Sequence, residues 1–107
     1  MNKSRRKELK RIKSELENIK IEIESIVERM EECKSDMECV KDEEESAYDN
    51  LPEFLQESEK GESMQTAMEY METAMDSVDS IVDSLQSSTQ DFEELYSAID
   101  DAISCRA

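Results

Sequence analysis

The chain has 107 residues, of which 39% are charged, and its 29 acidic and 13 basic residues give a formal net charge of −16. A chain this acidic is not attracted to nucleic acid or anionic lipid, so an electrostatic partner should be basic. With five aromatic residues, one glycine and one proline, the composition is typical of one elongated coiled-coil domain over residues 1–107 and excludes a large globular core.

The first predicted element is a long helix over about residues 4–48. Its first thirteen residues hold seven basic groups and one acid, which opposes the dipole of an isolated helix. Apolar residues then recur at alternating steps of three and four, as the a and d positions of heptads do. This stripe consists of Leu9, Ile12, Leu16, Ile19, Ile23, Ile26, Met30, Cys33, Met37 and Val40, with an interruption at Glu44 before Ala47.

A hinge is predicted over residues 49–62, because this segment holds the only proline and the only glycine. Pro52 lacks an amide hydrogen and disfavours a helical Leu51, and Gly61 should relax the chain nearby. Two roles are open for the hinge side chains. Pro52, Phe54 and Leu55 fold over the helix ends as a cap, or Phe54 and Leu55 are exposed anchors inside a ring of acids.

A second long helix is predicted over about residues 59–104, with Ser58 as its N-cap and Glu59 and Glu62 in its first turn. Its apolar stripe consists of Met64, Met68, Met71, Met75, Val78, Val82, Leu85, Phe92, Tyr96, Ile99 and Ile103, with a polar interruption at Thr89. A second stripe beside it contains Ala67, Ala74, Ile81, Ser88, Leu95 and Ala102. Small residues allow close helix packing, so this face predicts a homodimer in the form of a two-fold symmetric four-helix bundle, although a partner protein could occupy it instead.

The two stripes match when the second helix folds back on the first and the numbers of facing residues sum to 108. Leu9 then meets Ile99, and Leu16 meets Phe92. The predicted fold is therefore all-α, an antiparallel coiled-coil hairpin. In this arrangement Lys34 should lie beside Asp76 and Lys41 beside Glu69. The basic N-terminus should lie against Glu93, Glu94, Asp100 and Asp101.

The densest charge lies near the hinge, where residues 28–62 hold 14 acids and four basic residues. This segment is either a solvated face that keeps the rod soluble or a docking surface for a basic site, including mimicry of a nucleic-acid backbone. The predicted partner-binding residues are Glu43, Glu44, Glu45, Glu53, Phe54, Glu57 and Glu59.

No enzyme activity, cofactor or metal site is predicted. The methionines could bind monovalent copper, but all of them fall on the core stripe, where thioethers fill gaps. A di-iron bundle needs inward Glu-x-x-His motifs, and the chain has no histidine. Cys33, Cys39 and Cys105 form no CxxC and indicate reduced cytosolic thiols. No apolar run is long enough to span a bilayer, so the chain is expected to be soluble.

Two parts of the chain resemble known protein families. Tyr96 and Asp100 form Y-x-x-x-D, which is similar to the export signal of the small helical-hairpin substrates of type VII secretion, although the Trp-x-Gly of that family is missing. The hinge, with Asp49, Asn50, Leu51, Pro52 and Glu53, then Leu55, Gln56, Ser58, Glu59, Gly61 and Glu62, resembles that of small acidic proteins of Gram-positive phages and mobile elements.

The hinge resemblance implies a phage accessory protein that acts in the cytoplasm of the bacterial host. Such a protein would bind and inhibit or sequester a basic bacterial protein that handles nucleic acid, for example a defence nuclease. The competing hypothesis is a scaffold that functions through self-assembly, and an exported type VII substrate is a further alternative.

Overall fold

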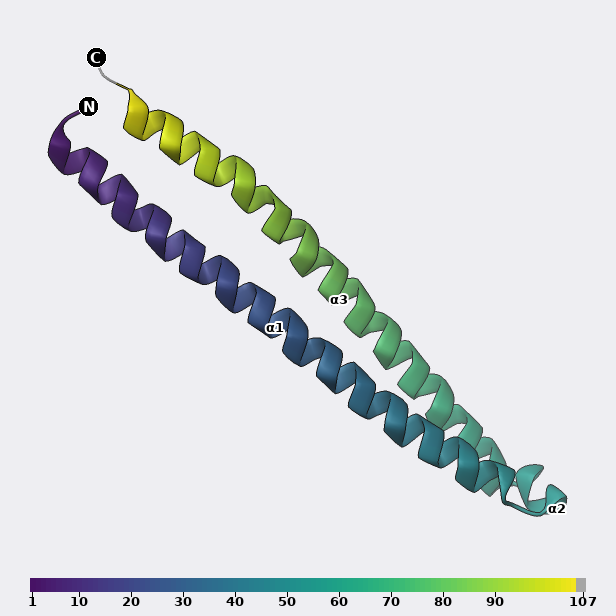
Figure 1. Cartoon of the computed structure of the whole chain (residues 1–107). Coiled ribbons are helices and arrows are strands. Elements are labelled where there is room, and N and C mark those ends of the chain that lie inside the picture. The colour runs from purple at the N-terminus through teal and green to yellow at the C-terminus, as the bar shows by residue number, and fades with distance from the viewer. Residues whose placement is uncertain (106–107) are drawn as a thin grey trace. The chain divides into compact units, whose positions relative to one another are not determined.

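The computed structural model describes residues 1–105, which form three helices and no strand: α1 (Lys3–Asp49), α2 (Glu53–Gln56) and α3 (Glu59–Ser104) (Figure 1). The prediction of an all-α chain with two long helices is confirmed, and both helices end within a residue of their predicted bounds. The short helix α2 was not predicted. None of the helices within residues 1–105 has an apolar stretch of the length needed to cross a membrane.

The N-terminus of α1 is capped by a residue that sequence analysis missed. The Asn2 side-chain oxygen accepts a hydrogen bond from the backbone N–H of Arg5 at 2.8 Å. This bond satisfies one of the free amides at the start of the helix and lets α1 begin among cations that oppose its dipole.

The segment between the long helices is held by hydrogen bonds. Pro52 has extended backbone angles (φ −56°, ψ 146°) and its carbonyl accepts the N–H groups of Leu55 and Gln56 at 2.8 and 3.1 Å, which starts α2. The Gln56 side-chain amide donates to the carbonyls of Tyr48 at 3.0 Å and Leu51 at 3.2 Å. Because Tyr48 belongs to the last turn of α1, Gln56 ties α2 to the end of that helix.

Ser58 is the N-cap of α3, as predicted. Its hydroxyl oxygen accepts the N–H of Gly61 at 3.5 Å, and its carbonyl accepts the N–H of Glu62 at 3.0 Å. The hydroxyl also donates to the carbonyl of Leu55, which joins the cap to α2.

The role predicted for Gly61 is wrong. Gly61 does not relax a loop but lies buried in the first turn of α3, with no positive φ. A Cβ at this position would come within 2.0 Å of the carbonyl oxygen of Gln56. Glycine is needed here because the backbone at the end of α2 approaches that of α3 too closely for a side chain.

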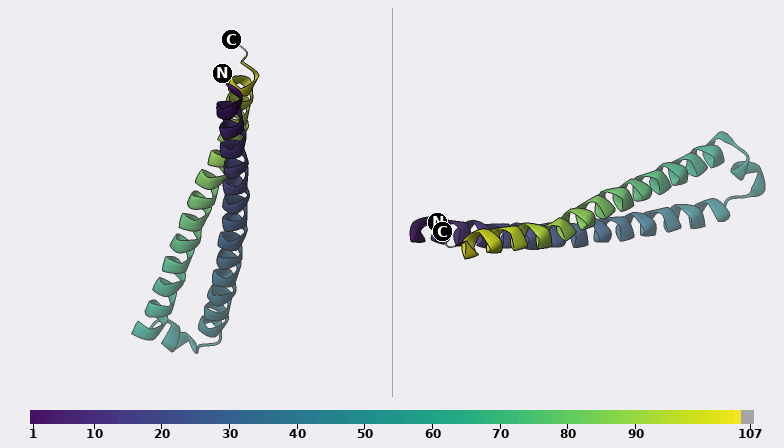
Figure 2. Two further views of the ribbon diagram at one scale, coloured as in Figure 1. Left: turned by 90° about the vertical axis from the view of Figure 1, so that its left-hand side faces the viewer. Right: turned by 90° about the horizontal axis from the view of Figure 1, so that it is seen from above.

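The chain divides into two compact units: a terminal unit (Met1–Glu28 and Asp83–Ala107) and a connector unit (Arg29–Val82). In the terminal unit, the start of α1 lies beside the end of α3 in every view (Figures 1 and 2). Lys13 binds Asp100 at 2.8 Å and Lys20 binds Glu93 at 3.2 Å. Arg6 donates to the carbonyls of Ile103 and Cys105 at 3.1 and 2.7 Å, where the dipole of α3 favours a cation.

In the connector unit, Lys34 binds Asp79 at 2.8 Å and Lys41 binds Glu72 at 2.6 Å. The acids that the lysines bind lie one helical turn beyond the predicted Asp76 and Glu69, although Asp76 lies near Lys34, as predicted, and contributes to its raised pKa. With Met68 and Met75 at a, Glu72 and Asp79 occupy e positions, which flank the seam. Glu69 and Asp76 occupy b positions, which lie farther from the seam than e positions do.

The ion pairs define a register within each unit. In all four of these pairs the two residue numbers sum to 113, and both residues occupy e positions. In an antiparallel pair of heptads this spacing places Leu16 level with Phe92 in the terminal unit and Met37 level with Met71 in the connector unit, as the predicted layers do. The Tyr96 hydroxyl also donates to the carbonyl of Leu16 at 3.5 Å.

The packed face of α1 is rotated from the predicted a and d positions toward a and e. Val27, at an e position, is buried at 7% exposure, whereas Ile26 and Val40, at d positions, are 42% and 54% exposed. The lysines at e positions are half-buried because their methylene stems lie along the seam while the ammonium groups reach carboxylates. The expectation that every d residue of α1 is a core residue is therefore wrong.

Candidate functional site

The negative charge of the chain is concentrated in the connector unit. Residues 29–82 contain 17 acidic and four basic residues, a net charge of −13 out of −16 for the whole chain. This unit therefore carries the acidic surface that sequence analysis predicted near the hinge.

Half of the basic residues of this unit are already committed to internal ion pairs. The hydrogen bond that Lys34 donates to Asp79 raises the pKa of Lys34, and the one that Lys41 donates to Glu72 raises the pKa of Lys41, so both lysines are fully charged at neutral pH. The structure shows no ion pair for Arg29 or Lys60 within the part of the chain that it describes. Most carboxylates of the connector unit thus remain free to act on a partner.

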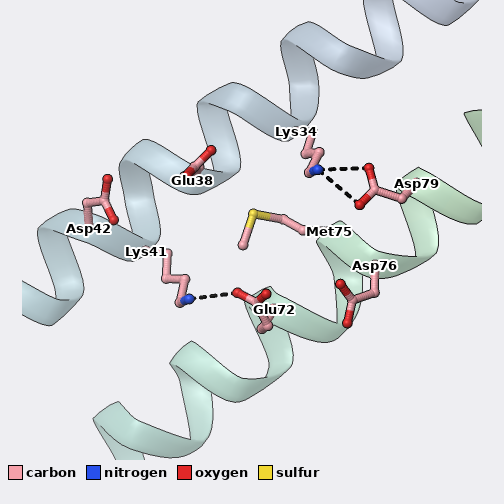
Figure 3. A pocket seen from close by; sticks show the side chains of 8 residues that line it. All are labelled: Lys34, Glu38, Lys41, Asp42, Glu72, Met75, Asp76 and Asp79. Atoms are coloured by element: carbon pink, nitrogen blue, oxygen red, sulfur yellow. Dashed lines mark hydrogen bonds and ion pairs between the residues drawn. The ribbon is translucent and has the colours of Figure 1, made fainter.

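A pocket in the connector unit shows how these carboxylates are arranged (Figure 3). The pairs Lys34–Asp79 and Lys41–Glu72 bridge α1 and α3 on either side of Met75, which forms the apolar floor and is 5% exposed. Three further carboxylates line the pocket without an ion pair in the described structure: Glu38, Asp42 and Asp76. An apolar floor with unpaired carboxylates at its edge suits the stem and charged head of an arginine or lysine side chain.

Sequence analysis missed this part of the site. Glu38 and Asp42 are four residues apart on α1, which places them on one face of the helix. The sequence shows the four-residue spacing of Glu38 and Asp42. Recognising the pocket also requires knowing which acids the lysines bind.

The predicted acids all belong to the connector unit, although they do not form a single face. Glu43, Glu44 and Glu45 are consecutive on α1, so their side chains point in directions about 100° apart. Glu44 is half-buried, while Glu43 and Glu45 are exposed. Glu53, Glu57 and Glu59, on or next to α2 and at the start of α3, are also exposed.

Phe54 projects into solvent from α2 with 72% of its surface exposed, whereas Leu55 is half-buried. The cap role predicted for Phe54 is therefore not the one that the structure shows. An exposed phenylalanine between Glu53 and Glu57 has the geometry of the alternative role, an anchor within an acidic surround.

The predicted self-association face lies on α3. Ile81 is 48% exposed and Leu95 is 37% exposed, Ala67 is exposed, and Ala74 and Ala102 are half-buried. Nothing in the described residues covers the two large side chains.

The other candidate motifs are occupied or dispersed. The hydroxyl of Tyr96 is bonded to Leu16, and Asp100 is bound by Lys13, so the two residues of the export-like motif are held within the terminal unit. The three cysteines are free and exposed. Among residues 1–105 no three His, Cys, Asp or Glu side chains are grouped so that they could hold a metal ion.

Comparisons of this chain with protein-family models, with curated proteins and with solved structures find no match.

Proposed function

We propose that this protein is a non-enzymatic inhibitor that binds a basic, nucleic-acid-handling surface of another protein through its connector unit. The observation that carries the proposal is the net charge of −13 on this unit, whose two seam lysines are neutralised internally. The carboxylates without an ion pair then face a partner beside two lysines whose charge an acid of α3 already balances.

The chemistry of the pocket suggests how such a partner is held. A basic side chain enters over Met75 and is bound by Glu38, Asp42 and Asp76, while the three consecutive glutamates at the end of α1 add to the field. Phe54 supplies an apolar contact, which long-range charge alone does not provide. Together these groups would occupy the surface of the partner that otherwise binds the phosphates of a nucleic acid. The resemblance of the hinge to phage proteins makes a bacterial defence nuclease the kind of target that we propose.

We also propose that the two units form one antiparallel hairpin. The common sum of 113 in the ion pairs of both units supports this arrangement, because a continuous hairpin keeps one register along its length.

The proposal is tested by capture from a bacterial lysate followed by competition. The immobilised wild-type chain and a variant with Glu38, Asp42 and Asp76 changed to Gln are exposed to the same lysate, and captured proteins are identified by mass spectrometry. Glutamine keeps the size of these side chains or nearly so and removes their charge. We expect a basic protein on the wild-type chain that is depleted at least tenfold on the variant and is displaced by a DNA or RNA duplex.

A matched variant controls for the loss of three charges. Glu15, Glu17 and Glu28 are exposed acids of α1 in the terminal unit, and their change to Gln should leave capture unchanged. Equal loss in both variants, or a captured protein that nucleic acid does not displace, would refute a specific acidic site in the connector unit.

A second candidate function is assembly through α3, and the exposure of Ile81 and Leu95 is the observation that favours it. In this case the acidity provides solubility, and the chain acts as a scaffold. Self-association through α3 is nevertheless compatible with binding of a basic partner, since the two use different surfaces.

A further inference from the structure

The uncharged surface of α3 is wider than the predicted self-association stripe. With Met68 at a, the g and c positions of this helix recur at steps of three and four and form a second seam. Its members are Ala67, Tyr70, Ala74, Ser77, Ile81, Ser84, Ser88, Asp91, Leu95, Ala98, Ala102 and Cys105. Eleven of these twelve residues carry no charge, in a chain with 39% charged residues.

The corresponding surface of α1 is different. Its six g positions, Glu8, Glu15, Glu22, Arg29, Asp36 and Glu43, are all charged, and two of its six c positions, Arg11 and Glu32, are charged as well, so eight of these twelve residues carry a charge. The uncharged second seam is thus a property of α3 alone and does not follow from the general composition of the chain.

Most of the exposed large hydrophobic side chains lie on or beside this seam. Tyr70, Ile81 and Leu95 are members of it, with 72%, 48% and 37% of their surface exposed. The half-exposed d row of α1 continues the apolar surface within each unit: Ile19 in the terminal unit and Val40 in the connector unit. Among the eight large hydrophobic residues with exposed side chains, only Ile21 and Phe54 fall outside the seam and the d row.

The angle between the two seams of α3 indicates what kind of assembly covers the second one. At about 100° per residue, the middle of the g and c seam lies about 110° around the helix from the middle of the a and d seam. A helix in a four-helix bundle contacts two neighbours at roughly a right angle, and this spacing is close to that value.

We propose that the second seam of α3 binds the same seam of a second copy, with the two α3 helices antiparallel. This inference rests on the self-association in the second candidate function and specifies its surface, direction and register. When the full length of the seam overlaps, Tyr70 of one copy faces Ala102 of the other and Leu95 faces Ser77. Ala74 then faces Ala98. Tyr70 and Leu95 thus oppose small residues, as close helix packing requires, whereas Ile81 faces Asp91 of the other copy.

The distribution of charge selects the antiparallel direction. Parallel α3 helices would place the two connector units, each with a net charge of −13, beside one another. Antiparallel helices place each connector unit beside the terminal unit of the other copy, which has a net charge of only −3 and whose first thirteen residues have a net charge of +6. The antiparallel pairing also separates the two Asp91 side chains, which would meet in a parallel pair in register.

The seam is large enough for a stable contact. From residue 67 to residue 105 it is about 57 Å long, and at a width of about 10 Å it would bury about 1,100 Å² over both copies. This area exceeds the roughly 1,000 Å² expected of a biological interface.

The oligomeric state is measured first, by light scattering of the full chain at about 100 µM. We expect twice the 12.4 kDa mass of one chain. Ile81→Glu should give the monomer mass, whereas Ser87→Glu, an exposed position of α3 outside both seams, should remain dimeric. A monomeric wild-type chain would overturn the proposal and leave the face to a different protein.

The direction is tested by disulfide trapping in a background with Cys33, Cys39 and Cys105 changed to Ser. Ala74→Cys and Ala98→Cys are made separately and together, since both are small changes on exposed or half-buried helix positions. Only the double variant should form a covalent dimer on oxidation, because residues 74 and 98 face each other across the antiparallel seam. A covalent dimer from either single variant would overturn the antiparallel direction, even if the mass shows a dimer. No covalent dimer from the double variant would overturn the register.

Discussion

At the scale of single residues, the connection between the long helices depends on contacts between backbone atoms that leave no room for side chains. Gly61 is buried against the carbonyl of Gln56, and the Gln56 side chain closes the end of α1. Glycine normally lowers helix stability by about 1 kcal/mol relative to alanine, so its presence in the first turn of α3 has a steric cause.

We therefore expect Gly61→Ala to destabilise the fold by about 1–3 kcal/mol, the usual cost of overpacking. The measurement is chemical unfolding followed by circular dichroism. Lys60→Ala, a change at the exposed neighbour, is the control and should stay within about 0.5 kcal/mol of the wild type. If Gly61→Ala proved more stable than the wild type, helix propensity would outweigh the contact, and the close approach of α2 would be absent.

Phe54 is the other residue whose role the structure narrows. Because 72% of its surface is exposed, Phe54→Ala should leave the unfolding midpoint unchanged. If Phe54 is an anchor, the same variant should bind the captured partner at least about 30-fold more weakly, which corresponds to about 2 kcal/mol. Leu55→Ala offers the contrast, since Leu55 is half-buried and should lower the midpoint. A fall in the midpoint with Phe54→Ala would restore the cap role.

At the scale of the helices, the lysines at the e positions of α1 have two structural roles. Their stems line the seam, and their ammonium groups select acids on α3, which fixes direction and register. Exposed pairs of this kind contribute little energy one by one, so their main effect is on specificity.

The seam lysines predict a pH dependence at the alkaline end. The hydrogen bonds that Lys34 donates to Asp79 and Lys41 donates to Glu72 raise the pKa values of the two lysines above the ordinary 10.5. A raised pKa in the folded state means that this stabilisation is complete below about pH 10.5 and is lost as the pH rises through the folded pKa. Stability should therefore fall in that range, as measured by thermal unfolding.

A pair of charge-matched variants isolates this effect. Lys34→Gln with Lys41→Gln should lower the midpoint at pH 8 and weaken its alkaline fall. Arg29→Gln with Lys60→Gln removes the same charge from residues without a described ion pair and should keep the alkaline fall of the wild type. Identical pH profiles for the two double variants would show that the seam pairs contribute nothing measurable.

At the scale of the whole molecule, charge and apolar surface are separated. The connector unit carries most of the negative charge, and α3 carries a long uncharged seam. In the proposed antiparallel dimer the two acidic units would lie at opposite ends of the paired α3 helices. The protein would then offer two docking surfaces for basic partners, and bivalent binding raises avidity without new contacts.

Partner binding by the connector unit should be steeply dependent on salt, because exposed charges are screened within about 8 Å at physiological ionic strength. Changing Glu43, Glu44 and Glu45 to Lys should abolish binding of the captured protein and leave the dimer mass unchanged. Affinity is measured by calorimetry at increasing sodium chloride concentration. An affinity that does not change with salt would contradict recognition by charge.

Much of this architecture follows from the sequence alone. Heptad spacing predicts both long helices, Pro52 and Ser58 predict where one ends and the next begins, and charge counts locate the acidic segment, because these properties depend on neighbours along the chain. The tertiary structure decided the rest: the rotation of the packed face of α1 toward Val27, the acid that each seam lysine binds, the exposure of Phe54 and the steric need for Gly61. Each of these depends on how closely one helix approaches another, and periodicity within one helix contains no information about that distance.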